Sequence, residues 1–150
     1  MKEAAIILTC GIFNSRNAKT AFGLVRNSEY YDILAVIDQN FSGQDAGEFV
    51  DGKFLEIPIH ATINAFLRAQ STKLQLALEE CGRGVNAIIG IATPGGVIPE
   101  VLRLELLEAL SYGMHIVNGL HHYLSDDSEL VRAAKENQAK LLDIRKPKSA

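Results

Sequence analysis

The stretch AIIGIATPGG, residues 87–96, places a strand-like apolar run directly before a glycine loop. Thr93, Pro94, Gly95 and Gly96 stop the run before a helical pattern begins at Pro99. In an open parallel sheet, ligands lie beyond the carboxyl ends of strands, where glycine permits close backbone approach and helix N-terminal amides face anions. This order of strand, loop and helix therefore predicts that these four loop residues contribute to a ligand site.

Composition indicates one globular domain. The 150 residues are 47% hydrophobic and 22% charged, which suits a single domain with its own core. A net charge of -3 offers no cationic field for nucleic acid. No apolar run approaches the ~20 residues of a membrane span, so we expect a cytoplasmic protein that binds neither nucleic acid nor membrane. Cys10 and Cys81 form no CxxC pair, and we expect two unpaired thiols.

Strand-like and helix-like patterns alternate along the chain. We expect strands at residues 4–9, 33–37, 57–59, 87–92, 115–117 and 141–144. We expect helices at residues 18–26, 61–81, 99–112 and 127–139. Such alternation predicts an α/β fold, a Rossmann-like open parallel sheet of about six strands with helices on both faces.

Several helix boundaries carry their own signals. Pro99 suits the first turn of its helix and Gly113 suits the C-terminal cap. Asp126, with Glu129 three residues later, is an N-cap candidate for the last helix. Residues 39–56 lack apolar periodicity, so we expect a loop there, with room for one helical turn.

The loop after the first expected strand lacks the GxGxxG fingerprint, because Gly11 is its only glycine. This disfavours an ordinary dinucleotide site. The loop nevertheless ends at a helix start with Asn17, Lys19 and Thr20, where free amides and an ammonium group can hold a phosphate or carboxylate. We therefore expect Gly11, Lys19 and Thr20 to contact the ligand. The alternative is an ordinary Asn17 cap with a solvated lysine.

The next two candidates follow the second expected strand. Asp38 occupies the position of the acidic residue that binds ribose hydroxyls in Rossmann domains, or it caps the turn that follows. Gly43, Gln44 and Asp45 belong to a glycine loop that either folds over a nucleotide or is a plain surface turn.

Other motifs are weaker. Residues 47–54 satisfy GxxxxGK, but Phe54 replaces the serine or threonine that binds magnesium, so we interpret Asp51-Gly52 as a turn. The histidines have no ligand spacing, and we expect no metal. His121 either faces the ligand crevice or is a structural histidine. No residue pattern identifies a catalytic group.

Five blocks carry a family resemblance. They are Ala18–Leu24, Val36–Asp38, Ser42–Gly47, Thr93–Gly96 and Gly119–Asp127. Together they resemble the N-terminal domain of the D-glutamate N-acetyltransferase-like family, long known as a domain of unknown function. The resemblance covers about residues 4–147, and its loops are also similar to the CoA-binding domain of succinyl-CoA synthetase.

The resemblance implies a two-domain organisation. Residues 1–147 would form the Rossmann-like N-terminal domain, and residues 148–150 would begin a linker to a P-loop domain. The family implies a nucleotide-type ligand, with acetyl-CoA or an adenine nucleotide as the expected cofactor. The expected partners are this ligand, the P-loop domain and further copies of the chain.

Three functions are therefore open. The first is the nucleotide- or CoA-binding part of an acetyltransferase-like enzyme that is not catalytically complete alone. The second is an NAD(P)-dependent epimerase or dehydrogenase domain, although Tyr112 and Tyr123 lack the lysine four residues later that such enzymes use. The third is a docking or dimerisation module without catalysis.

Overall fold

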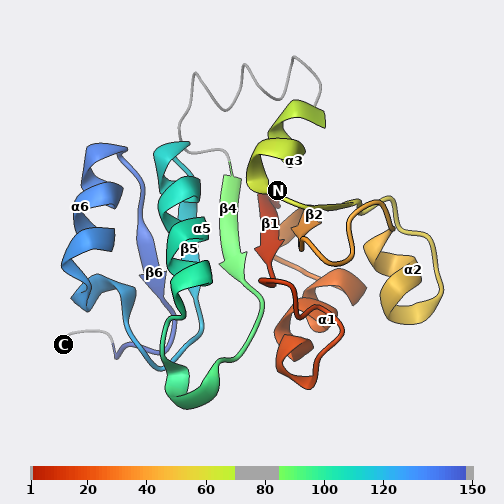
Figure 1. The fold of residues 1–150 in the computed structure, drawn as a ribbon, viewed down its shortest axis with the longest axis horizontal. Helices are drawn as coiled ribbons and strands as arrows, with labels where there is room; N and C mark the ends of the chain where they lie inside the picture. The colour runs from red at the N-terminus through yellow and green to blue at the C-terminus, as the bar shows by residue number, and fades with distance from the viewer. Residues whose placement is uncertain (1, 70–84, 148–150) are drawn as a thin grey trace.

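The fold is an open six-stranded sheet in the order β3-β2-β1-β4-β5-β6 (Figure 1). The computed structural model describes residues 2–69 and 85–147. All adjacent strands pair in parallel. The strands are β1 (Glu3–Leu8), β2 (Tyr31–Ile37), β3 (Ile59–His60), β4 (Val85–Ile89), β5 (His115–Asn118) and β6 (Leu141–Asp143). This arrangement confirms the predicted Rossmann-like class, and it places the switch in strand order between β1 and β4.

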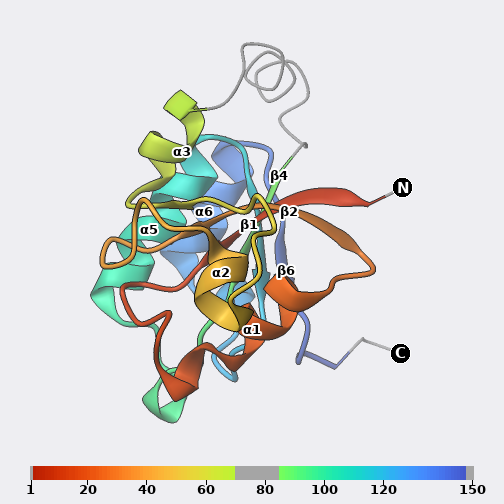
Figure 2. The same ribbon diagram turned by 90° about the vertical axis from the view of Figure 1, so that its right-hand side faces the viewer.

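Helices cover both faces of the sheet. Figures 1 and 2 show α3, α5 and α6 on one face, with α1 on the other. The helices are α1 (Lys19–Arg26), α2 (Ala46–Asp51), α3 (Ile63–Ala69), α5 (Glu100–Ser111) and α6 (Ser128–Glu136). Short 3₁₀ helices are η1 (Arg16–Ala18), η2 (Pro94–Gly96) and η3 (Leu124–Asp126). Among the helices within the described residues, none is long and apolar enough to cross a membrane.

Some expected boundaries change. Pro99 is the N-cap of α5 rather than a residue of its first turn, because its ψ of 157° is extended. Asp127, not Asp126, caps α6, since its side chain accepts a hydrogen bond from the Leu130 amide. The expected helix at residues 61–81 is confirmed only at its start, in α3, because residues 70–81 lie outside the described part.

Residues 39–56 contain a short capped helix rather than loop alone. Asp45 accepts a hydrogen bond from the Glu48 amide and so begins α2. Gly52 ends α2 in the left-handed region at φ 69°, which glycine adopts without a side-chain clash. The GxxxxGK match therefore falls on a helix and its cap, in agreement with the turn expected at Asp51-Gly52. Residues 148–150, the expected linker, lie outside the described residues.

Helix α1 lies directly against the sheet where β4 ends. The Ala21 amide donates a hydrogen bond to the Gly90 carbonyl at 3.1 Å. A Cβ atom on Gly90 would lie 2.4 Å from Ile7 Cγ2 and 2.9 Å from Ala21 Cβ. Glycine at this position therefore sets how closely α1 approaches the strands.

Gly90→Ala should destabilise the fold by roughly 1–3 kcal/mol, because the added methyl group overpacks a filled space. Urea unfolding measures this loss. Gly23→Ala is the matched control, since Gly23 lies in α1 and a Cβ atom there would have no neighbour within 4 Å. The control should gain up to about 1 kcal/mol from helix propensity. Equal stability of Gly90→Ala and the unmodified protein would contradict the close contact.

Candidate functional site

A pocket of about 380 Å³ opens at the carboxyl ends of β4, β5 and β6. Most of its lining is apolar, with polar groups at a few positions, which is the usual character of a small-molecule site. Its polar side chains come from α1, from the loop after β4 and from the loops after β5 and β6. The lining residues are Thr20, Ile88, Ile89, Ile91, Ala92, Thr93, Gly96, Val117, Gly119, Leu120, His121, Ile144 and Arg145.

The sheet face beneath α1 provides part of the apolar lining. Strand register places Ile88, Val117 and Leu142 side by side on this face. Ile88 and Val117 are only 4% and 5% exposed, whereas Leu142 is 42% and Ile144 is 67% exposed. The apolar surface therefore begins buried at β4 and becomes solvent-accessible at β6, next to the mouth of the pocket.

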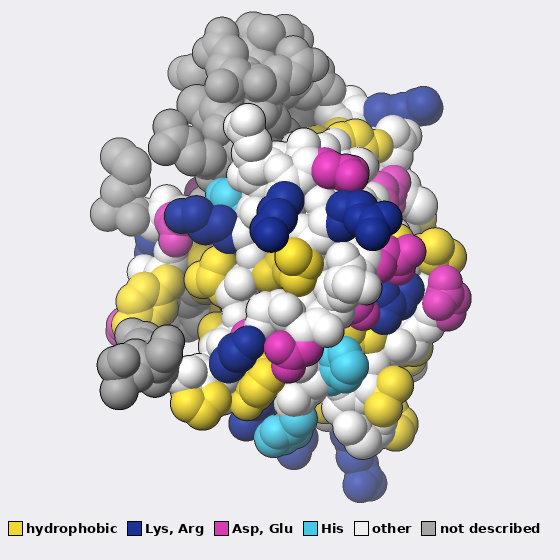
Figure 3. Space-filling view, turned by 90° about the vertical axis from the view of Figure 1, so that its left-hand side faces the viewer, with side chains coloured by type: hydrophobic (Ala, Val, Ile, Leu, Met, Phe, Trp, Pro, Cys, Tyr) yellow, Lys and Arg dark blue, Asp and Glu magenta, His cyan; other side chains and the backbone are white. Residues whose placement is uncertain are grey.

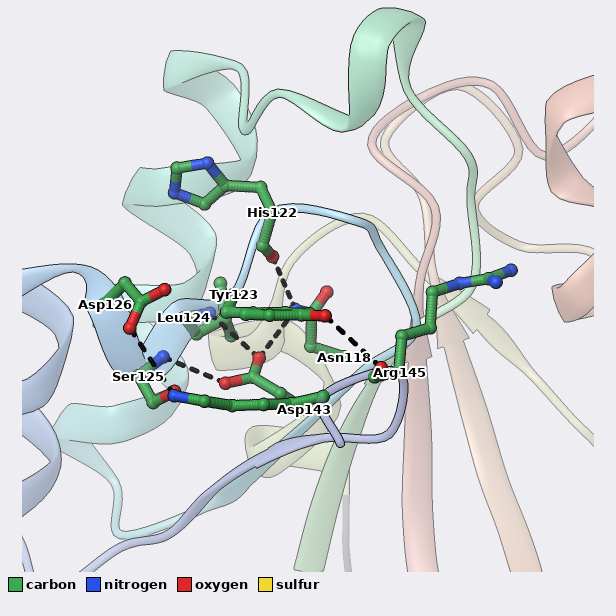
Figure 4. Close-up of polar contacts among 9 residues, drawn as sticks. Asn118, His122, Tyr123, Leu124, Ser125, Asp126, Asp143 and Arg145 are labelled. Atoms are coloured by element: carbon green, nitrogen blue, oxygen red, sulfur yellow. Dashed lines mark hydrogen bonds and ion pairs between the residues drawn. The ribbon is translucent and has the colours of Figure 1, made fainter. Parts of the chain in front are cut away.

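The loop after β5 is fixed to β6 by one carboxylate (Figure 4). Asp143 Oδ1 accepts hydrogen bonds from Asn118 Nδ2 and the Leu124 amide, both at 2.8 Å. Its Oδ2 accepts from the Ser125 amide at 3.0 Å. Burial raises the pKa of Asp143, but these donors outweigh it, so the pKa lies below its usual value. The carboxylate thus holds the loop that carries His121 against the end of the sheet.

The glycine loop after β4 also packs against this second loop. Gly95 and Gly96 have φ values of 66° and 69°, a left-handed conformation that favours glycine. A Cβ on Gly96 would lie 3.1 Å from His121 Cβ. Gly96, predicted to let a ligand approach, therefore also lets two loops of the protein approach each other at the rim of the pocket.

Asp38 is fully buried, with both carboxylate oxygens engaged. Its Oδ2 accepts hydrogen bonds from Thr9 Oγ1 at 2.7 Å and from the Phe13 amide at 3.0 Å. Its Oδ1 accepts from the Asn40 amide at 2.9 Å, the turn-capping contact that was the alternative to ribose binding. In this structure Asp38 therefore joins the loops that follow β1 and β2.

Protein groups fill the space beside the loop after β1. Phe13 is fully buried, and its ring stacks on Phe49 at a centroid distance of 4.9 Å. Gly11 is buried at φ 84°, and its carbonyl accepts a hydrogen bond from Asn40 Nδ2 at 2.9 Å. The region that holds the pyrophosphate in dinucleotide-binding Rossmann domains is thus tied to the second loop.

The loop at residues 43–45 lies at the opposite edge of the sheet from β6. The Gly43 amide donates to the Ile59 carbonyl at 3.0 Å, and the Ile59 amide donates to the Gln44 carbonyl at 2.9 Å, which ties this loop to the edge strand β3. Asp45 Oδ1 also accepts from the Ile57 amide at 2.7 Å. Burial opposes ionisation of Asp45, but backbone donors including the Leu55, Glu48 and Ile57 amides lower its pKa. Gly43, Gln44 and Asp45 line a separate shallow pocket with Phe54, Glu56 and Pro58.

The structure therefore divides the predicted site residues into groups. Thr20, Thr93, Gly96 and His121 line the pocket at β4–β6. Lys19, Pro94 and Gly95 are neighbours of these residues in the chain but do not line the pocket. Gly11 and Asp38 lie at the ends of β1 and β2, while the 43–45 loop lies beside β3. The single crevice expected from the sequence is thus spread across the width of the sheet.

Sequence reasoning missed Ile144 and Arg145 as lining residues. Ile144 is the last residue of the last expected strand, and Arg145 follows it in a run, residues 145–150, whose composition resembles a linker. Arg145 could have been proposed from its position, since it follows an expected strand and so lies at the same carboxyl edge of the sheet as the other candidates.

A thiol and a carboxyl group meet near the switch point. Cys10 is a free thiol with φ 51°, and its Sγ lies 3.9 Å from Glu105 Oε1 on α5. Burial, followed by the charges of Glu105 and Asp38, raises the pKa of Cys10 to about 12. Burial and the charges of Glu108 and Asp38 raise the pKa of Glu105 to about 7. Cys10 is therefore protonated at neutral pH. Cys81 lies outside the described residues.

The fold defines the chain as a Rossmann-like domain, and the comparisons identify its family. The chain belongs to DUF1611_N, described as a Rossmann-like domain of unknown function, whose model matches residues 39–147. This membership confirms the resemblance found in the sequence blocks.

Named relatives support the same family. The chain is 40% identical to a D-glutamate N-acetyltransferase of Pseudoalteromonas sp over 63 residues, which are 42% of this chain and 19% of that protein. It is 30% identical to a D-glutamate N-acetyltransferase of Tritonibacter scottomollicae over 76 residues, 51% of this chain and 23% of that protein. The crystal structure of a DUF1611 family protein from Anabaena variabilis superposes with a TM-score of 0.78 at 31% identity, covering 99% of this chain and 39% of that chain. The chain thus spans well under half the length of each of these relatives.

Asp38→Asn should destabilise the protein by about 1.5–3 kcal/mol, because a carboxylate that accepts buried hydrogen bonds is replaced by an amide whose NH₂ group faces donors. Thermal unfolding measures the change. Asp32→Asn, at an exposed position of β2, is the matched control and should stay within about 0.5 kcal/mol of the unmodified protein. An Asp38→Asn variant with unchanged stability and lost nucleotide binding would instead support the ribose role.

Proposed function

We propose that the pocket at β4–β6 binds a nucleotide- or CoA-type ligand. The observation that carries the proposal is the pocket itself, about 380 Å³ in volume and bounded by the strand ends, the glycine loop and the N-terminal part of α1. An apolar lining with a few convergent polar groups suits a ligand with a flat or aliphatic part and a polar end. Acetyl-CoA and adenine nucleotides both meet this description.

The names of the relatives suggest the reaction in which such a ligand would take part. Two of them are named D-glutamate N-acetyltransferase, and an acetyltransferase needs an acyl donor such as acetyl-CoA. In this proposal the chain is the ligand-binding N-terminal part of such an enzyme. The transfer chemistry is then assigned to a further domain, of the P-loop type that the family resemblance implies.

The geometry favours this ligand class over NAD(P). Asp38, the candidate for a ribose contact, is buried and already accepts hydrogen bonds from Thr9, Phe13 and Asn40. A dinucleotide bound in the usual Rossmann manner would have to displace these contacts. A ligand in the pocket at β4–β6 leaves them intact.

The proposal predicts that ligand binding is blocked by a bulky residue at the pocket mouth. Thr20 is exposed and lines the pocket, so Thr20→Trp should obstruct it without disturbing the core. The measurement is the thermal shift produced by AMP, coenzyme A, acetyl-CoA and NAD. A ligand at one hundred times its Kd adds about 2.7 kcal/mol to the stability of the unmodified protein, and this gain should disappear in the variant.

Two further substitutions locate the binding site. Lys19→Trp changes an exposed neighbour that does not line the pocket, and Gln44→Trp changes the shallow pocket beside β3. Both variants should keep the ligand response. Loss of the response in Gln44→Trp alone would move the site to β3. Stabilisation by NAD alone would favour the oxidoreductase function, and no response to any ligand would favour the docking module.

A further inference from the structure

Arg145 is held at the rim of the pocket through its backbone. The preceding Asp143 anchors the loop after β5, and the Ile144 amide donates to the Asn118 carbonyl at 3.0 Å. Tyr123 Oη donates to the Arg145 carbonyl at 3.3 Å. This region of the chain is therefore a fixed part of the site rather than a free tail.

The guanidinium group of Arg145 has unused hydrogen-bonding capacity. Its Nε donates to the Gly119 carbonyl, and neither Nη group has a hydrogen-bond or ion-pair partner in the described part of the chain. Arg103 differs, because its Nη groups bind Asp127 and Glu129. Figure 4 shows the Arg145 side chain extending away from Asp143, so the carboxylate of that cluster does not neutralise it.

The neighbouring groups favour an anion at this position. No acidic side chain is among the described residues that line the pocket, whereas Thr20 and His121 supply a hydroxyl and an imidazole group. The Thr93 hydroxyl already donates to the Val97 carbonyl at 2.6 Å. Seen from the β6 edge, basic side chains are spread over the whole face, and some of them lie with histidine at the lower end, towards the carboxyl ends of the strands (Figure 3). A guanidinium with free Nη groups binds phosphate or carboxylate oxygens through paired hydrogen bonds.

We propose that Arg145 is the anion anchor of the pocket. The ligand then carries a phosphate or carboxylate group that binds the Arg145 Nη atoms, and an apolar part that lies on Ile88, Val117 and Ile144. The inference rests on the proposed function. It adds that the part of the ligand next to β6 is an anionic group, a phosphate or a carboxylate. It also assigns a binding role to a residue near the end of the expected N-terminal domain, close to the expected linker at residues 148–150.

The test compares charged and uncharged probes by isothermal titration calorimetry. AMP and adenosine differ by the phosphate group alone, and N-acetyl-D-glutamate is the carboxylate probe. In Arg145→Gln, the Kd of the probe that uses this anchor should rise about tenfold or more, the size expected when a charged hydrogen-bond donor is lost. The Kd of adenosine should change less than about twofold, since it has no anion to bind.

Lys146→Gln is the matched control because it removes the same charge from the next residue. Lys146 Nζ contacts Ser125 Oγ at 2.8 Å and Asp126 Oδ1 at 3.4 Å and does not line the pocket, so its loss should leave the affinity for AMP and N-acetyl-D-glutamate within about twofold. Arg145→Lys should recover only part of the affinity, because lysine keeps the charge but not the paired donors.

The possible results distinguish anion binding by Arg145 from ligand binding by the pocket as a whole. A selective loss of AMP affinity in Arg145→Gln supports a phosphate anchor, and a selective loss for N-acetyl-D-glutamate supports a carboxylate anchor. Equal binding of both anions by Arg145→Gln and the unmodified protein overturns the anchor while the pocket function stands. If the unmodified protein binds none of the probes and gives no thermal shift with coenzyme A or acetyl-CoA, both proposals are wrong.

Discussion

The position of α1 against β4 determines the shape of the pocket at β4–β6. Gly90 lies between Ile89 and Ile91, which line the pocket, and its carbonyl accepts a hydrogen bond from Ala21, the residue after Thr20. Because a Cβ at Gly90 would meet both Ile7 and Ala21, only glycine allows the helix to approach this closely. The contact brings Thr20 over the strand ends, so one packing constraint both completes the core and forms a wall of the pocket.

At the ends of β1 and β2, on the other side of the switch in strand order, the loops are packed differently from those of a dinucleotide-binding domain. There, Asp38 binds the loop after β1 through Thr9 and Phe13, and the aromatic rings of Phe13 and Phe49 fill the adjoining volume. These interactions use polar and apolar groups of the protein where a cofactor would otherwise be bound. A pocket of about 380 Å³ opens instead at β4–β6, where the apolar sheet face becomes exposed at Leu142 and Ile144.

The alternation of apolar runs and helical patterns was sufficient to predict the fold, because parallel strands need crossover connections. The positions of the strand-end loops were also predictable, and Thr93, Gly96 and His121 do meet at one pocket. What could not be read from one sequence was the lateral spacing between loops. The contact of Asp38 with the Asn40 amide is the turn cap that the sequence offered as one alternative, but its contacts with Thr9 and Phe13 depend on the approach of the loop after β1 in space. Arg145 was missed because a short run of basic residues and proline has the same composition whether it is a linker or a site wall.

The central claim is that the ligand edge of this DUF1611_N domain lies at β4–β6, between α1 and the loops after β5 and β6. The most direct measurement is the change in backbone amide chemical shifts of the ¹⁵N-labelled protein on titration with AMP or coenzyme A. Our account predicts that the largest changes occur at Thr20, Gly96, His121 and Arg145. Largest changes at Gly11, Asp38 and residues 43–45, with little change around the pocket, would contradict it.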